Sequence, residues 1–177
     1  MTIKRSQAGD VEVRVNVYRD GQKLQNAEGS DNIYDFIQAI EIYESITSAT
    51  LEAKFVITDG SGFFGAMTGS ELFKVQIIGT IIDKTYYFRA YEIQSRTRYN
   101  TSDSFIVNCA SDEFFKNEVN NVFGNSEVVF KSTEASEIVR EILIDKRFLQ
   151  TKKKLFLEET INKQLFVAPN WRPFDCI

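Results

Sequence analysis

Apolar and polar residues alternate with a period of two through most of the first 110 residues, which is the pattern of half-buried β-strands. The clearest example is the segment 51–57, where Leu51, Ala53, Phe55 and Ile57 occupy every second position. The strands that this pattern predicts are 11–17, 34–45, 51–57, 71–79, 85–93 and 104–110. A run of short strands with few helices between them is typical of a β-sandwich or a closed barrel.

Turn signals separate these segments. The Asp-Gly pair at 20–21 favours a tight hairpin, because such a pair supplies positive φ angles. The polar stretch 25–32 predicts a loop, and Asp-Lys at 83–84 predicts the turn before the fifth strand. The Gly-rich stretch 59–62 ends the third strand, and we expect residues 63–67 to form a short helical turn or a packed loop.

After residue 110 the apolar period becomes that of a helix. The Ser-Asp-Glu segment 111–113 supplies an N-cap and an acidic first turn, and Gly124 fits the position after the last turn. We expect a short extended piece at 128–130 and then a second helix capped by Ser132 or Thr133. The predicted apolar faces are Phe114, Phe115, Val119, Val122 and Phe123 in the first helix and Ile138, Val139, Ile142 and Leu143 in the second.

We therefore predict a mainly β (α+β) fold with two parts, an antiparallel β-barrel domain at 1–110 and a helix-containing α/β segment at 111–177. Both prolines, Pro169 and Pro173, lie close to the last residue. The segment 169–177 is typical of a loop that leads into a helix, with Pro173 in its first turn. Because a single helical turn cannot bury a face, we expect the chain to be cut here or to continue in a related, longer polypeptide.

Composition excludes several classes of chemistry. Histidine is absent, which excludes Ser-His-Asp catalysis, Cys-His catalysis and His-containing zinc sites. The two cysteines, Cys109 and Cys176, are too few for a Cys-only zinc site or a disulfide framework, so we expect free thiols in a reducing cytoplasm and no metal or cofactor. The first residues contain no apolar run of signal-peptide length, and no stretch approaches the ~20 apolar residues needed to cross a bilayer. We therefore expect no secretion by the standard route and no membrane segment.

In a chain without histidine, pairs of carboxylates are the remaining candidates for general acid–base catalysis. Asp59 and Glu71 flank the Gly-rich loop, and Glu158 is adjacent to Glu159. Nothing in the sequence separates the pKa values within either pair, so we interpret all four as solvated surface charges and predict no catalytic residue. The Gly-rich stretch 60–65 lacks the Gly-Lys-Ser/Thr ending of a phosphate loop, and we expect a packed turn anchored by its two phenylalanines.

Two segments suggest nucleic-acid or partner contacts. The Lys-Lys-Lys run 152–154 has the charge to contact phosphate or an acidic partner, but we interpret it as a solvated loop. In the aromatic segment 86–91, alternation places Tyr87, Arg89 and Tyr91 on one face and the other residues on the opposite face. That pattern describes a base-stacking platform or a strand with one core face and one partner face. The net charge of −4 favours the second interpretation and argues against specific nucleic-acid binding.

The order of these segments resembles the N-terminal part of the baseplate hub proteins of contractile-tailed bacteriophages, the tail-tube-like family that binds the spike. The resemblance covers about residues 10–177. Its most specific pieces are Thr-Gly-Ser-Glu at 68–71 and Pro-Asn-Trp-Arg-Pro-Phe at 169–174. The other segments that contribute are 53–59, 88–93, 104–111, 139–143 and 167–168.

The resemblance implies a barrel related to the tail-tube protein at 1–110, followed at 111–177 by the start of an inserted domain. It also implies self-association, as a homotrimer with pseudo-sixfold symmetry, and contacts with a tail-tube protein and with a spike or tail-lysozyme protein. We therefore expect a non-enzymatic virion component of the tail baseplate that is assembled in the host cytoplasm. The alternatives are a β-barrel module that binds a small ligand, an oligosaccharide or single-stranded nucleic acid, and a carboxylate-dependent hydrolase.

Overall fold

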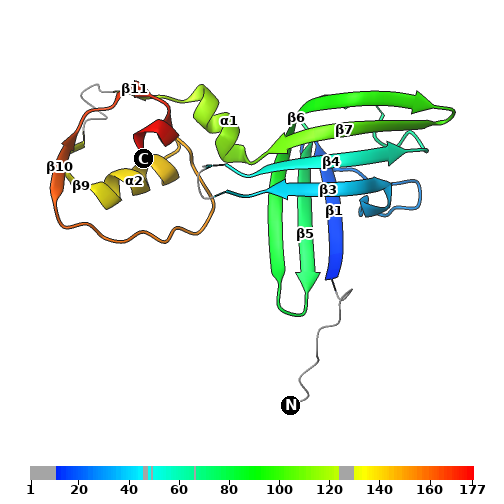
Figure 1. Ribbon diagram of the computed structural model, residues 1–177, viewed down its shortest axis with the longest axis horizontal. Helices are drawn as coiled ribbons and strands as arrows, with labels where there is room; N and C mark the ends of the chain where they lie inside the picture. Colours follow the sequence, from blue (N-terminus) through cyan, green and yellow to red (C-terminus); the bar gives the residue numbers. More distant parts are fainter. Residues whose placement is uncertain (1–10, 46–47, 49, 66, 124–129) are drawn as a thin grey trace, which may run out of the picture. The chain divides into compact units, whose positions relative to one another are not determined.

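The structure is a computed structural model that describes residues 11–45, 48, 50–65, 67–123 and 130–177 (Figure 1). The chain forms two compact units, Met1–Ser111 and Asp112–Ile177. Within the described residues, no helix is long and apolar enough to cross a membrane.

The described residues of unit 1 form one antiparallel sheet of seven strands. Their order in the sheet is β2-β1-β5-β6-β7-β4-β3. The elements are β1 (Val11–Arg19), β2 (Gln22–Lys23), the 3₁₀ turn η1 (Tyr34–Phe36), β3 (Ile37–Tyr43), β4 (Glu52–Asp59), β5 (Leu72–Gly79), β6 (Asp83–Tyr99) and β7 (Ser102–Ala110). The prediction of a mainly β fold followed by a smaller mixed α/β segment is confirmed.

The sheet folds over itself, and β6 belongs to both halves. Its first residues pair with β5, and its later residues pair with β7. The pairing with β7 shifts register between Ala90 and Glu92 and again between Gln94 and Thr97, which allows the 17-residue strand to bend. In Figure 1, β1 and β5 consequently run across the direction of β3, β4 and β7.

The core of unit 1 lies between the crossing halves. Phe55 on β4 stacks on Phe73 on β5 with 4.6 Å between ring centroids, and both side chains are fully buried. The alternation predicted for 51–57 is confirmed, because Ala53, Phe55 and Ile57 are buried in the core and Leu51, which precedes β4 and is half-buried, packs against it. Burial of large apolar side chains on both halves stabilises the folded sheet by about 1.5–3 kcal/mol for each side chain.

Of three local predictions in unit 1, for a hairpin, a turn and a strand, the structure agrees fully only with the hairpin. The Asp-Gly hairpin is confirmed, with positive φ of 50° at Asp20 and 77° at Gly21. The turn expected at 83–84 is wrong, because the hairpin closes earlier through a hydrogen bond from the Gly79 amide to the Ile82 carbonyl. The strand expected at 34–45 starts only at Ile37, after the 3₁₀ turn.

The described part of unit 2 combines two α-helices with short strand pairs. Its elements are α1 (Asp112–Val119), β8 (Val122–Phe123), β9 (Phe130–Glu134), α2 (Ala135–Ile144), β10 (Lys163–Phe166), β11 (Pro169–Trp171) and the 3₁₀ turn η2 (Pro173–Cys176). Strand β10 pairs with β9, and β11 pairs with β8. The buried hydrophobic cluster among the described residues of this unit consists of Val122, Phe130, Ile138, Ile142, Phe148, Leu149 and Ala168.

The helix boundaries predicted for unit 2 are partly wrong. Helix α1 ends at Val119, and the next apolar pair, 122–123, forms β8 because it hydrogen-bonds with β11. Helix α2 begins after Glu134, while Ser132 and Thr133 lie on β9. At residues 122–123 strand pairing overrides the helical period, and at residues 132–133 it overrides the local capping signal. Gly124, Val128 and Val129 lie outside the described residues, and the expected helical turn at Pro173 is observed as η2.

Candidate assembly surface

Asp59, at the end of β4, organises the Gly-rich loop that follows it. Its carboxylate accepts hydrogen bonds from the backbone amides of Ser61, Phe63 and Phe64 at 2.9–3.0 Å and from the Ser61 hydroxyl at 3.1 Å. Burial alone raises the pKa of Asp59, but the hydrogen bonds together outweigh it, and the pKa lies below its ordinary value. The loop is therefore built around an ionised carboxylate.

The backbone amides of this Gly-rich loop are not arranged as in a phosphate-binding loop. In a phosphate-binding loop the backbone N–H groups point at the ligand. Here three of those N–H groups point at the chain's own Asp59, and the Phe64 side chain is fully buried. The alternative of a packed turn, which the sequence favours, agrees with this geometry.

Glu71 holds the other end of the same loop. Its carboxylate accepts hydrogen bonds from the amides of Thr68 and Gly69 at 2.8 Å and pairs with Arg19 Nε at 3.0 Å. Arg19 also donates to the Phe64 carbonyl at 2.7 Å. Burial raises the pKa of Glu71, but the amide and guanidinium contacts outweigh it, so the pKa lies below normal. Arg19 is 52 residues away in the sequence, and no local signal predicts this partnership.

The interpretation of the four acids as solvated charges is therefore wrong for two of them. Asp59 and Glu71 are buried; the contacts to Asp59 come from the surrounding loop, and those to Glu71 come from the loop and Arg19. Glu158 and Glu159 are exposed, as expected. Among the described residues, no group of three His, Cys, Asp or Glu side chains is placed to hold a metal ion.

Both cysteines are free thiols. Cys109 on β7 is buried in the core of unit 1, and burial raises its pKa strongly. Cys176 is half-buried, and its pKa is also raised by burial. Neither thiol has the lowered pKa of a reactive cysteine.

The aromatic segment on β6 alternates as predicted. Phe88 and Ala90 are buried and Tyr86 is half-buried, on the face that packs against the core. Tyr87 and Tyr91 are exposed on the opposite face. The segment is therefore a strand with one core face and one outer aromatic face.

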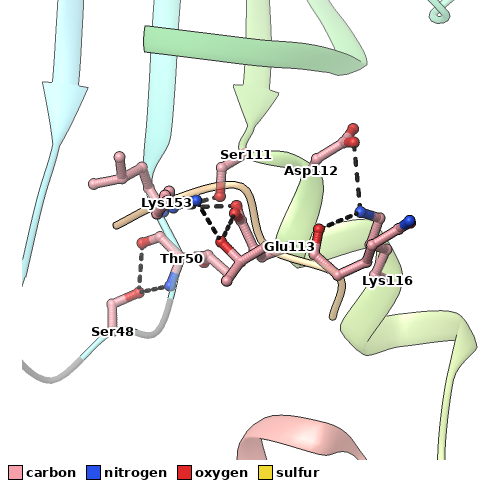
Figure 2. Close-up of polar contacts among 10 residues, drawn as sticks. Ser48, Thr50, Ser111, Asp112, Glu113, Lys116 and Lys153 are labelled. Atoms are coloured by element: carbon pink, nitrogen blue, oxygen red, sulfur yellow. Dashed lines mark hydrogen bonds and ion pairs between the residues drawn. The ribbon is translucent and has the colours of Figure 1, made fainter. Parts of the chain in front are cut away.

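The lysine run 152–154 is exposed, but Lys153 is bound. Figure 2 shows Lys153 close to Glu113 of α1, and the Nζ–Oε2 distance is 3.1 Å. The Thr151 hydroxyl donates to the other oxygen of Glu113 at 2.7 Å. Burial raises the pKa of Glu113, but these contacts outweigh it and the pKa is lowered. This lysine therefore has an internal role that the sequence interpretation of a solvated loop missed.

Strand β3 is an open edge of the sheet. It pairs with β4, and no described strand pairs with its other side. Its inward residues Ile40 and Ile42 are only half-buried, whereas their partners on β4, Phe55 and Ala53, are buried. The core is thus covered on the β4 side and incompletely covered along β3. An unpaired edge of this kind is a template for strand pairing with another chain.

A cavity of about 410 Å³ lies along this edge. It is open to solvent and is formed between β3 and the inner faces of β1 and β5. Most of its lining residues are apolar and none is charged, but polar atoms contribute nearly as much of its exposed surface as apolar atoms do. The lining residues are Val13, Tyr34, Ile37, Gln38, Ala39, Ile40, Ile42, Val75 and Ile77. We call this feature the β3 groove.

The tip of the β5–β6 hairpin is also apolar. Ile81 is 88% exposed and Ile82 is 49% exposed, although hairpin turns are usually built from polar residues and glycine. We call these two residues the isoleucine tip. The signal for it is present in the sequence, as two adjacent isoleucines between turn residues, but both lie outside the strands that the alternation predicts.

Comparison with known proteins identifies fold relatives only. No protein-family model matches the chain, and no curated protein matches its sequence. The solved tail protein from Neisseria meningitidis MC58 matches 93% of this chain with a TM-score of 0.53 and 11% sequence identity. The E. coli c3393 protein, a component of the type VI secretion system with structural similarity to T4 bacteriophage tail proteins gp27 and gp5, matches 91% with a TM-score of 0.42 and 9% identity. This chain spans 43% and 37% of those two chains, and the first likeness shows that it has the fold of the corresponding part of a tail protein.

Proposed function

We propose that this chain is a structural, non-enzymatic component of a phage-type tail, the hub or adaptor of the baseplate that joins the tail tube to the central spike. The observation that carries the proposal is the likeness to the Neisseria meningitidis tail protein over 93% of the chain, which includes residues of both units. The buried carboxylates are consistent with it, because Asp59 and Glu71 hold a loop and neither of these two side chains is open to a substrate.

Assembly in this proposal uses open sheet edges. An edge that is an aggregation hazard in a monomer becomes an interface when a neighbouring copy completes it. The free side of β3, with its half-buried isoleucines, is such an edge. We propose self-association into a ring, as a homotrimer with pseudo-sixfold symmetry, with a tail-tube protein on one side and a spike or tail-lysozyme protein on the other. The location is the virion baseplate, after assembly in the host cytoplasm.

The two units have different parts in this proposal. Residues 1–110 are the tube-like barrel domain, and residues 111–177 are the beginning of an inserted domain. Several large apolar side chains of unit 2 are more than half exposed, which suits a domain whose remaining surface is covered by further protein. These are Val119, Phe156, Ile161, Leu165, Val167, Trp171 and Ile177.

The negative net charge of the chain is compatible with a place in a tube through which DNA passes. The formal net charge is −4, and like charges discourage the binding of nucleic acid. We therefore expect no measurable affinity for double-stranded DNA at physiological salt. A positively charged lumen in the assembled ring contradicts this part of the proposal.

The deciding experiment is size-exclusion chromatography with light scattering, followed by negative-stain electron microscopy of the oligomeric fraction. The proposal predicts concentration-dependent oligomers and ring-shaped particles. A monomer at all concentrations that binds an oligosaccharide or single-stranded DNA with micromolar affinity contradicts it and supports the alternative, a ligand-binding β-barrel module.

A further inference from the structure

We propose that residues 153–159 of unit 2 pair with the same residues of a second copy of this chain, antiparallel and about a twofold axis through Phe156. We call this segment, Lys-Lys-Leu-Phe-Leu-Glu-Glu, the strap. In Figure 1 it is part of the orange connection from α2 to β10. The inference goes beyond the proposed function, because it concerns unit 2 and holds whether or not unit 1 assembles into a ring.

The strap is extended but belongs to no sheet. Half-buried Leu155 and Leu157 alternate with exposed Phe156 and Glu158, which is the period of a strand. Lys154 lies on the same side as Phe156, with its Nζ 4.7 Å from the centre of the ring. Within the described part of the chain, the backbone of residues 154–159 forms no hydrogen bond. Its N–H and C=O groups can therefore pair with a second strand.

Both ends of the strap are fixed to unit 2. At one end, Lys153 Nζ lies 3.1 Å from the Glu113 carboxylate. At the other end, the Thr160 amide donates to the Ser136 hydroxyl at 3.2 Å, and the Ser136 amide donates to the Thr160 hydroxyl at 3.1 Å. A segment that is already held in an extended form loses less conformational entropy when it pairs.

The charge pattern of the strap selects a second copy as its partner. Lysines precede the three apolar residues and glutamates follow them, so the charge changes sign about Phe156. In an antiparallel pair centred on Phe156, Lys154 of each copy lies opposite Glu158 of the other. The two Phe156 rings meet, and Leu155 lies opposite Leu157. Opposite charges and apolar side chains at such positions stabilise a strand pair.

The same pattern disfavours other pairings. In a parallel pair in register, Lys154 would lie opposite Lys154 and Glu158 opposite Glu158, and like charges that face each other are destabilising. The free edge strand β3, Ile37–Tyr43, contains Glu41 but no lysine or arginine, so it offers no partner to Glu158. The strap is complementary to its own antiparallel copy and not to that edge.

The contact is isologous, because each copy contributes the same residues. An isologous contact closes on two copies and does not extend into a filament. The strap therefore joins chains in pairs through unit 2, in addition to any contact that unit 1 makes along a ring.

The first test traps the pair with a disulfide in the full chain. Phe156→Cys, made with Cys176→Ser, places a thiol on the proposed axis, within disulfide distance of its copy. Mild oxidation should give a covalent dimer. Ile161→Cys in the same background is the control, at a site that is 91% exposed. Its two copies would lie about ten positions or about 33 Å apart, so it should give about tenfold less dimer or none. Equal cross-linking at the two positions, or none at either, overturns the proposal.

The second test exchanges the charges in the Phe156→Cys variant. Lys154→Glu alone, or Glu158→Lys alone, should lower the rate of dimer formation about tenfold, because both ion pairs become repulsive. An equal mixture of the two should recover the rate, since each charge then faces its opposite. Lys131→Glu, the same change of charge at an exposed residue of β9, should leave the rate unchanged. Absence of recovery in the mixture overturns the pairing.

Further readouts separate this inference from the proposed function. Thermal unfolding of each variant checks that unit 2 is intact. If rings form and Phe156→Cys gives no dimer, the strap pairing is wrong while the proposed function stands. If dimers form through the strap and no rings form, the strap pairing is supported and the self-assembly proposed for unit 1 is contradicted. A cross-link from Phe156→Cys to Ala39→Cys that exceeds its link to itself assigns the strap to the β3 edge and overturns the proposal.

Discussion

Units 1 and 2 differ in how well each buries its own apolar residues. In unit 1 the exposed large hydrophobic residues described by the structure are mainly tyrosines, which carry a polar hydroxyl group, together with the isoleucine tip and Val11. In unit 2 most of them are aliphatic or phenylalanine side chains, such as Phe156, Ile161 and Leu165. The difference indicates that unit 1 is closer to a self-sufficient fold, and that unit 2 has more to gain from a covering partner.

Strand geometry explains the difference. The sheet of unit 1 joins seven strands, and five of them have between seven and nine residues. The sheets of unit 2 are pairs of strands with two to five residues each. Two-stranded sheets are marginally stable in water unless a helix or another layer covers them. Stability in unit 2 therefore depends on the small cluster around Ile138 and Ile142.

The largest expected effect is on the core of unit 1. Phe55→Asp should abolish soluble folding or cost more than about 4 kcal/mol, because it places an unpaired charge against Phe73. Phe156→Asp, at a site that is 83% exposed in unit 2, should cost less than about 1 kcal/mol. Soluble yield and thermal unfolding measure both. Normal yield and melting of Phe55→Asp would refute the assignment of this face to the core.

The next effect concerns the buried carboxylates. Glu71→Gln should lower the free energy of unfolding by about 2–4 kcal/mol, because it leaves Arg19 and two loop amides without their anionic partner. Glu158→Gln, on an exposed residue, should change it by less than about 0.5 kcal/mol. Urea unfolding at neutral pH measures the free energy of unfolding of both variants. Equal effects of the two substitutions would contradict the structural role of Glu71.

The pH dependence of stability tests the role of Glu71 in a second way. The pKa of Glu71 is lower in the folded chain than its ordinary value of 4.5. Its stabilising contribution is therefore complete above the unfolded pKa and is lost as the pH falls through the folded pKa. The stability difference between wild type and Glu71→Gln should be constant above about pH 5.5 and should shrink below about pH 4. A difference that grows in acid would contradict the direction of the pKa shift.

Sequence reasoning is most successful where one periodicity controls the structure. The strand 51–57 is correct because alternate residues on β4 face a single core. It fails at Val122, where pairing with β11 overrides the helical period, and at Thr133, where pairing with Gln164 of β10 replaces a helix cap. It also misses the burial of Glu71, because the partner Arg19 is distant in sequence and becomes a neighbour only through the pairing of β1 with β5. Local patterns contain no information on such contacts.

Hydrogen exchange tests the difference between the units directly. Amides in the central strands β4, β5 and β7 should exchange only through global unfolding. Amides that pair β10 with β9 and β11 with β8 should exchange at least about 100-fold faster, through local opening of the short pairs. Mass spectrometry of peptides from the two units measures the ratio. Equal protection would mean that unit 2 is as well supported as the seven-stranded sheet.

The smallest expected effect is at Lys153. This lysine pairs with the buried Glu113 (Figure 2), as Arg19 pairs with the buried Glu71. Glu71 also accepts hydrogen bonds from two backbone amides, whereas Glu113 accepts one from the Thr151 hydroxyl. Lys153 is itself about half exposed, so water and salt weaken its attraction to Glu113. Lys153→Met should therefore cost only about 0.5–1 kcal/mol, and 1 M NaCl should remove most of that difference. Lys152→Met is the matched control and should have no effect. A salt-independent loss of several kcal/mol would instead show that Lys153 is as central to unit 2 as Arg19 is to unit 1.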